Sequence, residues 1–245
     1  MAYDEKRAEL TEHLTELRTR LLRSIVYVII GTIAAWFFYD QLLALLTKPM
    51  VGVMSAIGSK FLLTSFPEAF MVQLQVCLIA GLIVMSPLVL FELWGFVSPA
   101  LTKEEKRPLW WTMPLAAVLF LSGVTLCYFI LPTGFGWFAT FIPKHAEFRP
   151  TLQHGIRFSA LMMLAFGIVF ELPVLLMLLA KVGIVNSRML KENWRVAMVL
   201  VSVVAAIATP SNDAFSMLMM AVPVAGLYFA SILLVKLVEG KRRKE

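Results

Sequence analysis

Long uncharged apolar stretches constrain this fold more than any other feature of the sequence. A helix needs about 20 apolar residues to cross a hydrocarbon core roughly 30 Å thick. Six stretches approach or exceed that length: Ser24–Tyr39, Ala69–Phe91, Pro108–Pro143, Phe158–Ala180 (interrupted only by Glu171), Val196–Asn212 and Ala214–Val235. We therefore predict a single all-α, polytopic membrane domain over residues 1–245, with six transmembrane helices near residues 22–39, 69–93, 109–131, 158–180, 195–209 and 214–236.

The distribution of Lys and Arg predicts the orientation of these spans. Of the 22 Lys and Arg residues, seventeen fall in the N-terminal segment, the second and fourth connections and the C-terminal tail, and five fall in the other connections. Positive residues stay on the cytoplasmic side of a membrane. Both termini are therefore predicted to be cytoplasmic, in a multi-pass protein of the bacterial inner membrane. Topology thus explains the net charge of +6, and no nucleic-acid partner is expected.

The segments outside the spans are predicted to be one surface helix and a set of loops. Residues 3–20 carry leucines at helical spacing between charged residues, which is typical of an amphipathic helix on the cytoplasmic surface. Asp40–Pro67 and Pro132–Arg157 contain proline breakers and are predicted to be outside loops.

The fifth span is short, because only Val196–Ala208 precede the Thr209-Pro210 pair. At 1.5 Å per residue this helix covers roughly 20 Å, less than the hydrocarbon thickness. The Thr209–Asp213 turn is therefore predicted to lie below the outer surface of the membrane.

Enzymatic chemistry has no support in the sequence. The GxSxG, HExxH and GxxxxGK[ST] motifs are absent. His13, His145 and His154 are far apart and belong to no plausible set of metal ligands. We therefore predict neither an enzyme nor a metal or cofactor site.

Two carboxylates, Glu16 and Glu105, lie in basic segments that border the membrane on the cytoplasmic side. A carboxylate in such a place can bind an arginine guanidinium through two parallel hydrogen bonds. Each also has a structural alternative. Glu16 is four residues before Arg20 and can pair with it along one helix, and Thr102-x-x-Glu105 matches a capping box that opens the third span.

Other carboxylates lie in or at the ends of the spans. Glu171 is inside the fourth span, where an ionisable group is expensive and indicates either function or an internally hydrogen-bonded carboxyl that fixes packing. Glu92 is near the inner end of the second span, and snorkelling to the interface accounts for it. Asp213 is interpreted as the N-cap of the sixth helix.

Four motifs in order along the chain resemble those of the TatC family. They are residues 13–21 (HLTELRTRL), residues 96–101 (FVSPAL) followed by Glu105, residues 166–173 (FGIVFELP) and residues 209–216 (TPSNDAFS). The resemblance implies a receptor that binds twin-arginine signal peptides of folded precursor proteins. It also implies work with the single-span proteins TatB and TatA, contact with the lipid bilayer and self-association in a larger complex.

The resemblance also assigns roles to individual residues. Those implied in signal-peptide binding are Glu16, Glu105, Arg18 and Phe96. Those implied as structurally or functionally sensitive, including the intramembrane and partner-contact positions, are Pro49, Glu171, Thr209, Pro210 and Asp213.

Two other functions fit a six-span protein. One is a proton-coupled small-solute transporter that uses Glu171, although the sequence shows no inverted repeat and no paired broken helices. The other is a purely structural membrane subunit. Co-purification of a twin-arginine precursor, or solute uptake by the chain alone, would separate these readings.

Overall fold

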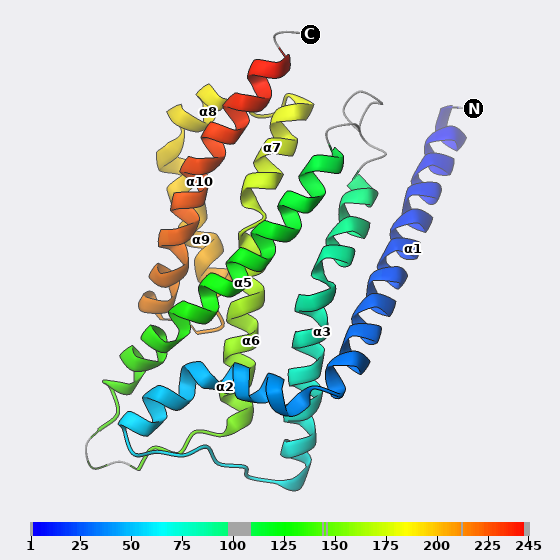
Figure 1. The fold of residues 1–245 in the computed structure, drawn as a ribbon. Coiled ribbons are helices and arrows are strands. Elements are labelled where there is room, and N and C mark those ends of the chain that lie inside the picture. The colour runs from blue at the N-terminus through cyan, green and yellow to red at the C-terminus, as the bar shows by residue number, and fades with distance from the viewer. Residues whose placement is uncertain (1, 98–108, 144, 146, 212, 243–245) are drawn as a thin grey trace.

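The fold is described from a computed structural model, which covers residues 2–97, 109–143, 145, 147–211 and 213–242. These residues form a bundle of α-helices (Figure 1). The helices are α1 (Ala2–Trp36), α2 (Tyr39–Ala56), α3 (Phe66–Val97), α5 (Leu109–Ala139), α6 (Leu152–Val169), α7 (Leu172–Val182), α8 (Ser187–Glu192), α9 (Trp194–Ala208) and α10 (Ala214–Arg242). The predicted all-α class is confirmed.

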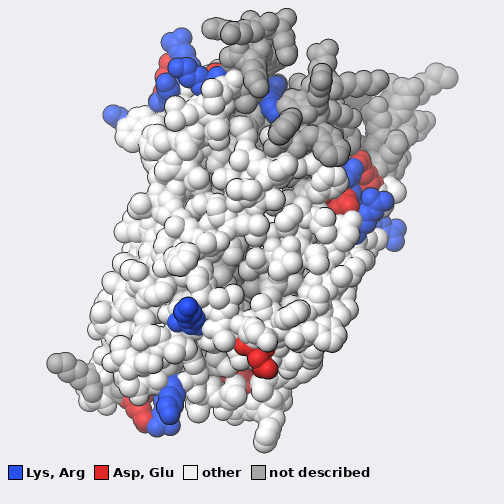
Figure 2. Space-filling view, viewed as in Figure 1, with Lys and Arg blue, Asp and Glu red and all other residues white. Residues whose placement is uncertain are grey.

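Helices occupy all six predicted spans. Within the described part of the chain, five stretches are long and apolar enough to cross a membrane, and α9 is a shorter apolar helix. Its 15 residues extend about 22 Å. A broad uncharged band separates charged residues near the two ends of the visible face (Figure 2). The first turn of α1 and the last turn of α10 lie at the same end of the bundle (Figure 1).

The predicted surface helix is not a separate element. Residues 3–20 continue without a break into the first span, so that α1 is one straight helix (Figure 1). Residues 17–26 contain neither glycine nor proline, so nothing in the backbone ends the helix where the leucine-rich pattern gives way to the apolar run. The predicted amphipathic segment is therefore helical, but it is the N-terminal part of α1 and not a separate helix.

The predicted first outside loop is also wrong, because most of it folds as α2, a helix that contains Pro49. A proline deprives the carbonyl four residues earlier of its helical donor. That carbonyl belongs to Leu45, and it accepts a hydrogen bond from the Tyr128 hydroxyl of α5 at 3.1 Å. The tertiary contact thus replaces the missing bond, and Pro49 is buried within an intact helix.

A left-handed glycine ends α2. Gly58 has a φ of 67°, a conformation that glycine adopts without steric penalty. The amides of Gly58 and Ser59 donate to the carbonyls of Ser55 and Met54 at 3.2 and 2.9 Å, which is the Schellman arrangement. The chain then turns back towards α3.

The second predicted outside loop is shorter than expected, since α5 continues past Pro132 to Ala139. The ring of Trp137, in this extension, stacks on Phe215 of α10 with 4.4 Å between centroids. The segment between α5 and α6 pairs with the segment between α2 and α3. The Leu62 amide donates to the Pro150 carbonyl at 3.0 Å, and the Leu152 amide donates to the Leu62 carbonyl at 3.1 Å. Together with α2, these connections close one end of the bundle.

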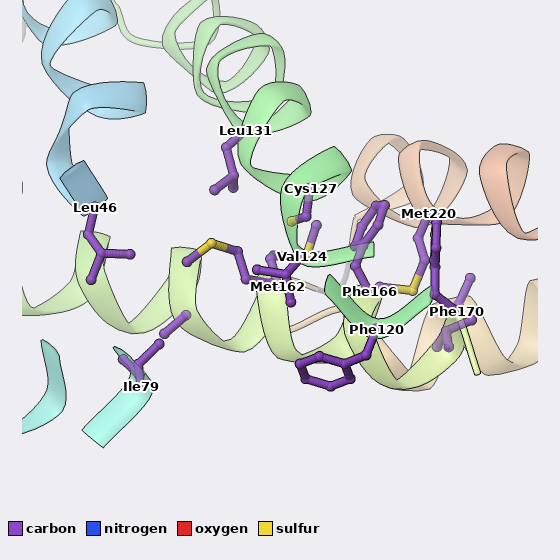
Figure 3. Packing of buried hydrophobic residues seen from close by; sticks show 14 of the residues in the cluster. Leu46, Ile79, Phe120, Val124, Cys127, Leu131, Met162, Phe166, Phe170 and Met220 are labelled. Carbon is purple, nitrogen blue, oxygen red and sulfur yellow. The ribbon is translucent and has the colours of Figure 1, made fainter. Parts of the chain in front are cut away.

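The main core lies where α2, α3, α5, α6, α9 and α10 converge (Figure 3). At the α5–α6 crossing the backbones approach closely, and a Cβ added at Gly123 would lie 2.7 Å from the Phe166 carbonyl oxygen. Small residues permit such approaches between membrane helices. The crossing places Phe166 and Phe120 in the centre of the core.

A second glycine crossing joins α1 to α3. A Cβ at Gly81 would lie 2.5 Å from the backbone nitrogen of Thr32, and one at Gly31 would lie 2.9 Å from the Gly81 carbonyl oxygen. These contacts are with backbone, which cannot move aside as a flexible side chain can. The crossing therefore depends on glycine and sets the position of α1 along α3.

Gly81→Ala is expected to destabilise the protein by about 1–3 kcal/mol, the usual range for overpacking. The matched control is Gly226→Ala in α10, where no atom lies within 4 Å of the added Cβ and alanine raises helix propensity by about 1 kcal/mol. Thermal unfolding in detergent should show a lower midpoint for the first variant only. Equal midpoints in both would contradict the close approach of α1 and α3.

Candidate functional site

An ion-pair cluster joins α1 to α3 near the end of the bundle where the chain begins. We call Glu16, Arg20, Arg23, Tyr27 and Glu92 the arginine–glutamate cluster. The Arg20 Nε and Nη2 atoms donate to Glu16 Oε1 at 2.9 and 2.8 Å. The third donor, Arg20 Nη1, reaches Glu92 Oε2 at 3.2 Å. One guanidinium therefore bridges two carboxylates on different helices.

The interpretation of Glu92 as a snorkelling residue is wrong. Its side chain is only 6% exposed, and it turns into the α1–α3 interface instead of towards the surface. The Tyr27 hydroxyl donates to Glu92 Oε1 at 3.3 Å, and Arg23 Nη1 lies 3.9 Å from the same oxygen. A carboxylate so deeply buried needs partners, and all three come from α1.

Local sequence explains how these side chains meet. Glu16 and Arg20 are one turn apart on α1, so the predicted i, i+4 pair forms. Across the interface Gly95 leaves room for the guanidinium, because a Cβ at that position would overlap Arg20 Nη1. The sequence reasoning missed Arg20 and Glu92 as partners, although Glu92-x-x-Gly95 pairs a carboxylate with a small residue one turn later.

The other residues predicted to bind signal peptides lie around or outside this cluster. Arg18 is exposed on α1 and forms no ion pair with the part of the chain that the structure describes. Phe96 is half-buried in the last turn of α3, one turn after Glu92. Glu105 and its capping-box alternative lie outside the described residues.

Glu171 lies at a break in the fourth predicted span. The helix is interrupted at Phe170 and Glu171, and Pro173 stands at the start of α7. The Glu171 amide donates a hydrogen bond to the Ile168 carbonyl, three residues earlier, and not to a carbonyl four residues earlier as in an α-helix. Both carboxyl oxygens are buried, and neither forms a hydrogen bond with a described residue. The structure thus places this carboxyl inside the protein and away from lipid.

The buried, polar carboxyl of Glu171 gives a direct prediction. Glu171→Gln keeps the shape and polarity of the side chain, whereas Glu171→Leu removes every polar atom, so the glutamine variant is expected to retain more activity. The measurement is the activity that each variant restores in cells that lack the native protein. Ile168→Leu, at a position 66% exposed, is the control. Full activity in both Glu171 variants would leave the carboxyl without a functional role.

The remaining predicted residues lie on α2 and at the α9–α10 turn. Thr209 is buried and caps the end of α9, while Pro210 is exposed. Asp213 Oδ1 accepts from the Ser216 amide at 2.8 Å, which confirms the interpretation of this residue as an N-cap. Among the described residues, Pro49, Thr209 and Asp213 form no hydrogen bond or ion pair with the arginine–glutamate cluster.

An apolar groove of about 330 Å³ runs beside the α2–α3–α5 junction. Its lining comes from α2, α3, α5 and α6 and includes Leu46, Ile83, Val84, Tyr128 and Met163. Val84 and Glu92 are on the same helix, eight residues or about 12 Å apart. The groove and the arginine–glutamate cluster are thus a short distance apart along α3.

Comparisons with known proteins agree on one family. The family model described as Sec-independent protein translocase protein (TatC) matches residues 12–223. The protein of that name from Desulforapulum autotrophicum is 38% identical over 244 residues, which cover 99% of this chain and 89% of the relative. The one from Xylanimonas cellulosilytica is 37% identical over 230 residues, covering 93% and 83%.

Solved structures agree with the sequence relatives. A crystal structure described as the twin-arginine translocase receptor TatC superimposes with a TM-score of 0.77 at 30% identity, covering 93% of this chain and 99% of that one. A second such structure, in DDM, gives a TM-score of 0.76 at 30% identity, with coverage of 91% and 98%.

Proposed function

Because the chain belongs to the TatC family of Sec-independent protein translocase proteins, we propose that it is the subunit that binds twin-arginine signal peptides. The observation that carries the proposal is that Glu16 already accepts two hydrogen bonds from one guanidinium, at a position 30% exposed. Both donors meet one oxygen, Glu16 Oε1, so the contact supports pairing of this carboxylate with a guanidinium at a site that solvent can reach.

Selectivity requires such fixed acceptors. The cytoplasmic leaflet is anionic and attracts any basic segment, so affinity for positive charge alone does not distinguish signals. A planar guanidinium matches a carboxylate through two bonds, whereas a lysine ammonium is a point charge. We assign one arginine of the pair to Glu16 and the other to Glu105, in the segment that joins α3 to α5, with Arg18 and Phe96 at the rim of the site.

The apolar groove suits the apolar part of a signal peptide. The groove lies about 12 Å from Glu92 along α3. A short extended or helical segment of the signal peptide can therefore bind in the groove while the arginines of the peptide remain at Glu16. Exposed ion pairs contribute only about 0.2–1 kcal/mol each, so apolar burial supplies most of the affinity in this proposal. Weak ionic contacts then suit a receptor that must release its cargo.

Export itself requires partners in this proposal. The resemblance names TatB and TatA, and the exposed apolar faces of α9 and α10, which include Val199, Val203 and Leu218, suit single-span helices as well as lipid. The short α9 favours local thinning of the bilayer where such partners gather. We also assign Glu171, Pro49 and the Thr209–Asp213 turn to the structurally or functionally sensitive positions of the protein, and both termini to the cytoplasm.

A solute transporter that uses Glu171 is the alternative from sequence. The family of the relatives favours protein translocation instead, and no second observation points to a solute. Uptake of a small solute by the purified chain in liposomes, driven by a proton gradient, would support the transporter.

A crosslinking experiment tests both the site and the orientation. A twin-arginine signal peptide with a photoreactive group beside the arginines is added to membrane vesicles that contain the chain. We expect crosslinks to the N-terminal part of α1 and to the α3–α5 connection, in inside-out vesicles only. The twin-lysine peptide is the control. Crosslinks confined to Lys60 and its neighbours in right-side-out vesicles would refute both the site and the cytoplasmic assignment of the termini.

A further inference from the structure

Arg20 occupies the carboxylate that the proposed function assigns to an incoming arginine. Its Nε and Nη2 atoms converge on one oxygen, Glu16 Oε1, so the chain fills its own site with the same chemical group that the signal carries. We propose that Arg20 is a specificity-determining residue, an internal competitor that a signal arginine must displace from Glu16. This inference rests on the proposed function, because it presupposes that Glu16 binds the signal.

The geometry provides a place for Arg20 after displacement. Its Nη1 donates to Glu92 Oε2 at 3.2 Å, and Glu92 is buried in the α1–α3 interface. The guanidinium can therefore leave Glu16 and remain paired with Glu92, without moving into apolar surroundings. Tyr27 and Arg23 hold the other oxygen of Glu92, which keeps that carboxylate in place throughout the exchange.

Arg20 and Glu16 are partly open to solvent, whereas Glu92 is enclosed. The side chain of Arg20 is 24% exposed and that of Glu16 is 30% exposed, whereas Glu92 is 6% exposed. A signal peptide can therefore approach Glu16 from solvent, but it cannot approach Glu92 without opening the helix pair. The exchange is confined to the exposed half of the cluster.

An internal arginine at Glu16 increases the preference for a twin-arginine over a twin-lysine peptide. A signal arginine replaces the two bonds that Arg20 gives up with two bonds of the same kind, so the exchange is nearly balanced. A lysine ammonium has no planar fork and replaces them poorly. Without Arg20, the Glu16 carboxylate has no internal partner to be displaced. The chain should then bind the twin-arginine and twin-lysine peptides more tightly, with a smaller difference between the two affinities.

The test measures peptide affinity for three proteins in nanodiscs at physiological salt. Arg20→Gln/Glu92→Gln removes the competitor and leaves no buried carboxylate without its partner. We expect this double variant to bind the twin-arginine peptide about two- to fivefold more tightly than the unaltered chain does, which corresponds to the loss of one exposed ion pair. Its affinity for the twin-lysine peptide should increase by a larger factor. Glu92→Gln alone keeps the competitor but weakens its alternative partner, and is expected to bind the twin-arginine peptide less tightly.

The outcomes separate this inference from the proposed function. If the unaltered chain does not prefer the twin-arginine peptide, the proposed function fails and the inference fails with it. If the preference exists but both variants match the unaltered chain, Arg20 is only structural and the inference alone fails. Arg20→Lys provides a further variant should the double variant not remain monodisperse: it keeps the charge opposite Glu92, loses the fork, and should also raise peptide affinity. An unchanged affinity in that variant overturns the inference.

Discussion

Replacing both Glu16 and Glu105 with alanine is expected to remove most of the preference for a twin-arginine over a twin-lysine signal peptide. Each exposed ion pair is worth about 0.2–1 kcal/mol, so the double variant should lose about two- to thirtyfold in affinity for the arginine peptide. Affinity for the lysine peptide should barely change, because it depends on general attraction to the anionic surface. Each single variant should lose part of the difference.

The measurement is peptide binding to the purified chain in nanodiscs, with monodispersity as the check on folding. Glu192→Ala is the matched control: this carboxylate is also exposed and paired with an arginine one turn away, Arg188, but it lies outside the proposed site. If both single variants bind the arginine peptide as tightly as the unaltered chain, the receptor site lies elsewhere, and Glu105 reverts to its capping-box interpretation.

Arg20→Met is expected to reduce the stability of the protein markedly, because Arg20 pairs with the buried Glu92 across the α1–α3 interface. It leaves the buried Glu92 carboxylate with only the Tyr27 hydroxyl and the more distant Arg23. Removing one partner of a buried ion pair usually destabilises by about 3–5 kcal/mol. Because two weaker partners remain, we expect about 3 kcal/mol, measured as a lower midpoint of thermal unfolding in detergent.

A second substitution should reverse most of this loss. In Arg20→Met/Glu92→Leu the buried carboxylate is gone and both side chains are apolar, a replacement that is often neutral or stabilising for a buried pair. Arg18→Met, two residues away on the same helix and exposed, is the control and should leave the midpoint unchanged. A double variant as unstable as Arg20→Met would show that Glu92 is not the source of the loss.

The sequence alone determined the class of protein and the approximate limits of its helices. Uncharged runs of about 20 residues have few alternatives to membrane-spanning helices, and helices do occupy all six predicted segments. Interactions between residues close in sequence were also predictable: the Glu16–Arg20 pair and the Asp213 cap both form. Four motifs in order indicated the family, which the comparisons confirm.

Predictions failed where contacts join distant parts of the chain. Pro49 looked like a loop residue, but the Tyr128 hydroxyl, 83 positions beyond Leu45, satisfies the carbonyl that the proline leaves open. Glu92 looked like an interfacial residue, but Arg20, 72 positions earlier, pairs with it inside the bundle. Periodicity reports which face of a helix is apolar, and it does not report which distant donor faces a given acceptor.

Sequence therefore determined the spans, the charge asymmetry and the local pairs, because these depend on transfer free energies and on helical spacing. Tertiary structure alone decided that α1 and α3 lie close enough at Gly31 and Gly81 for one guanidinium to reach two carboxylates. The physical reason is that a buried charge is tolerated only where a partner of opposite charge is held beside it, and that position is set by the packing of two helices together.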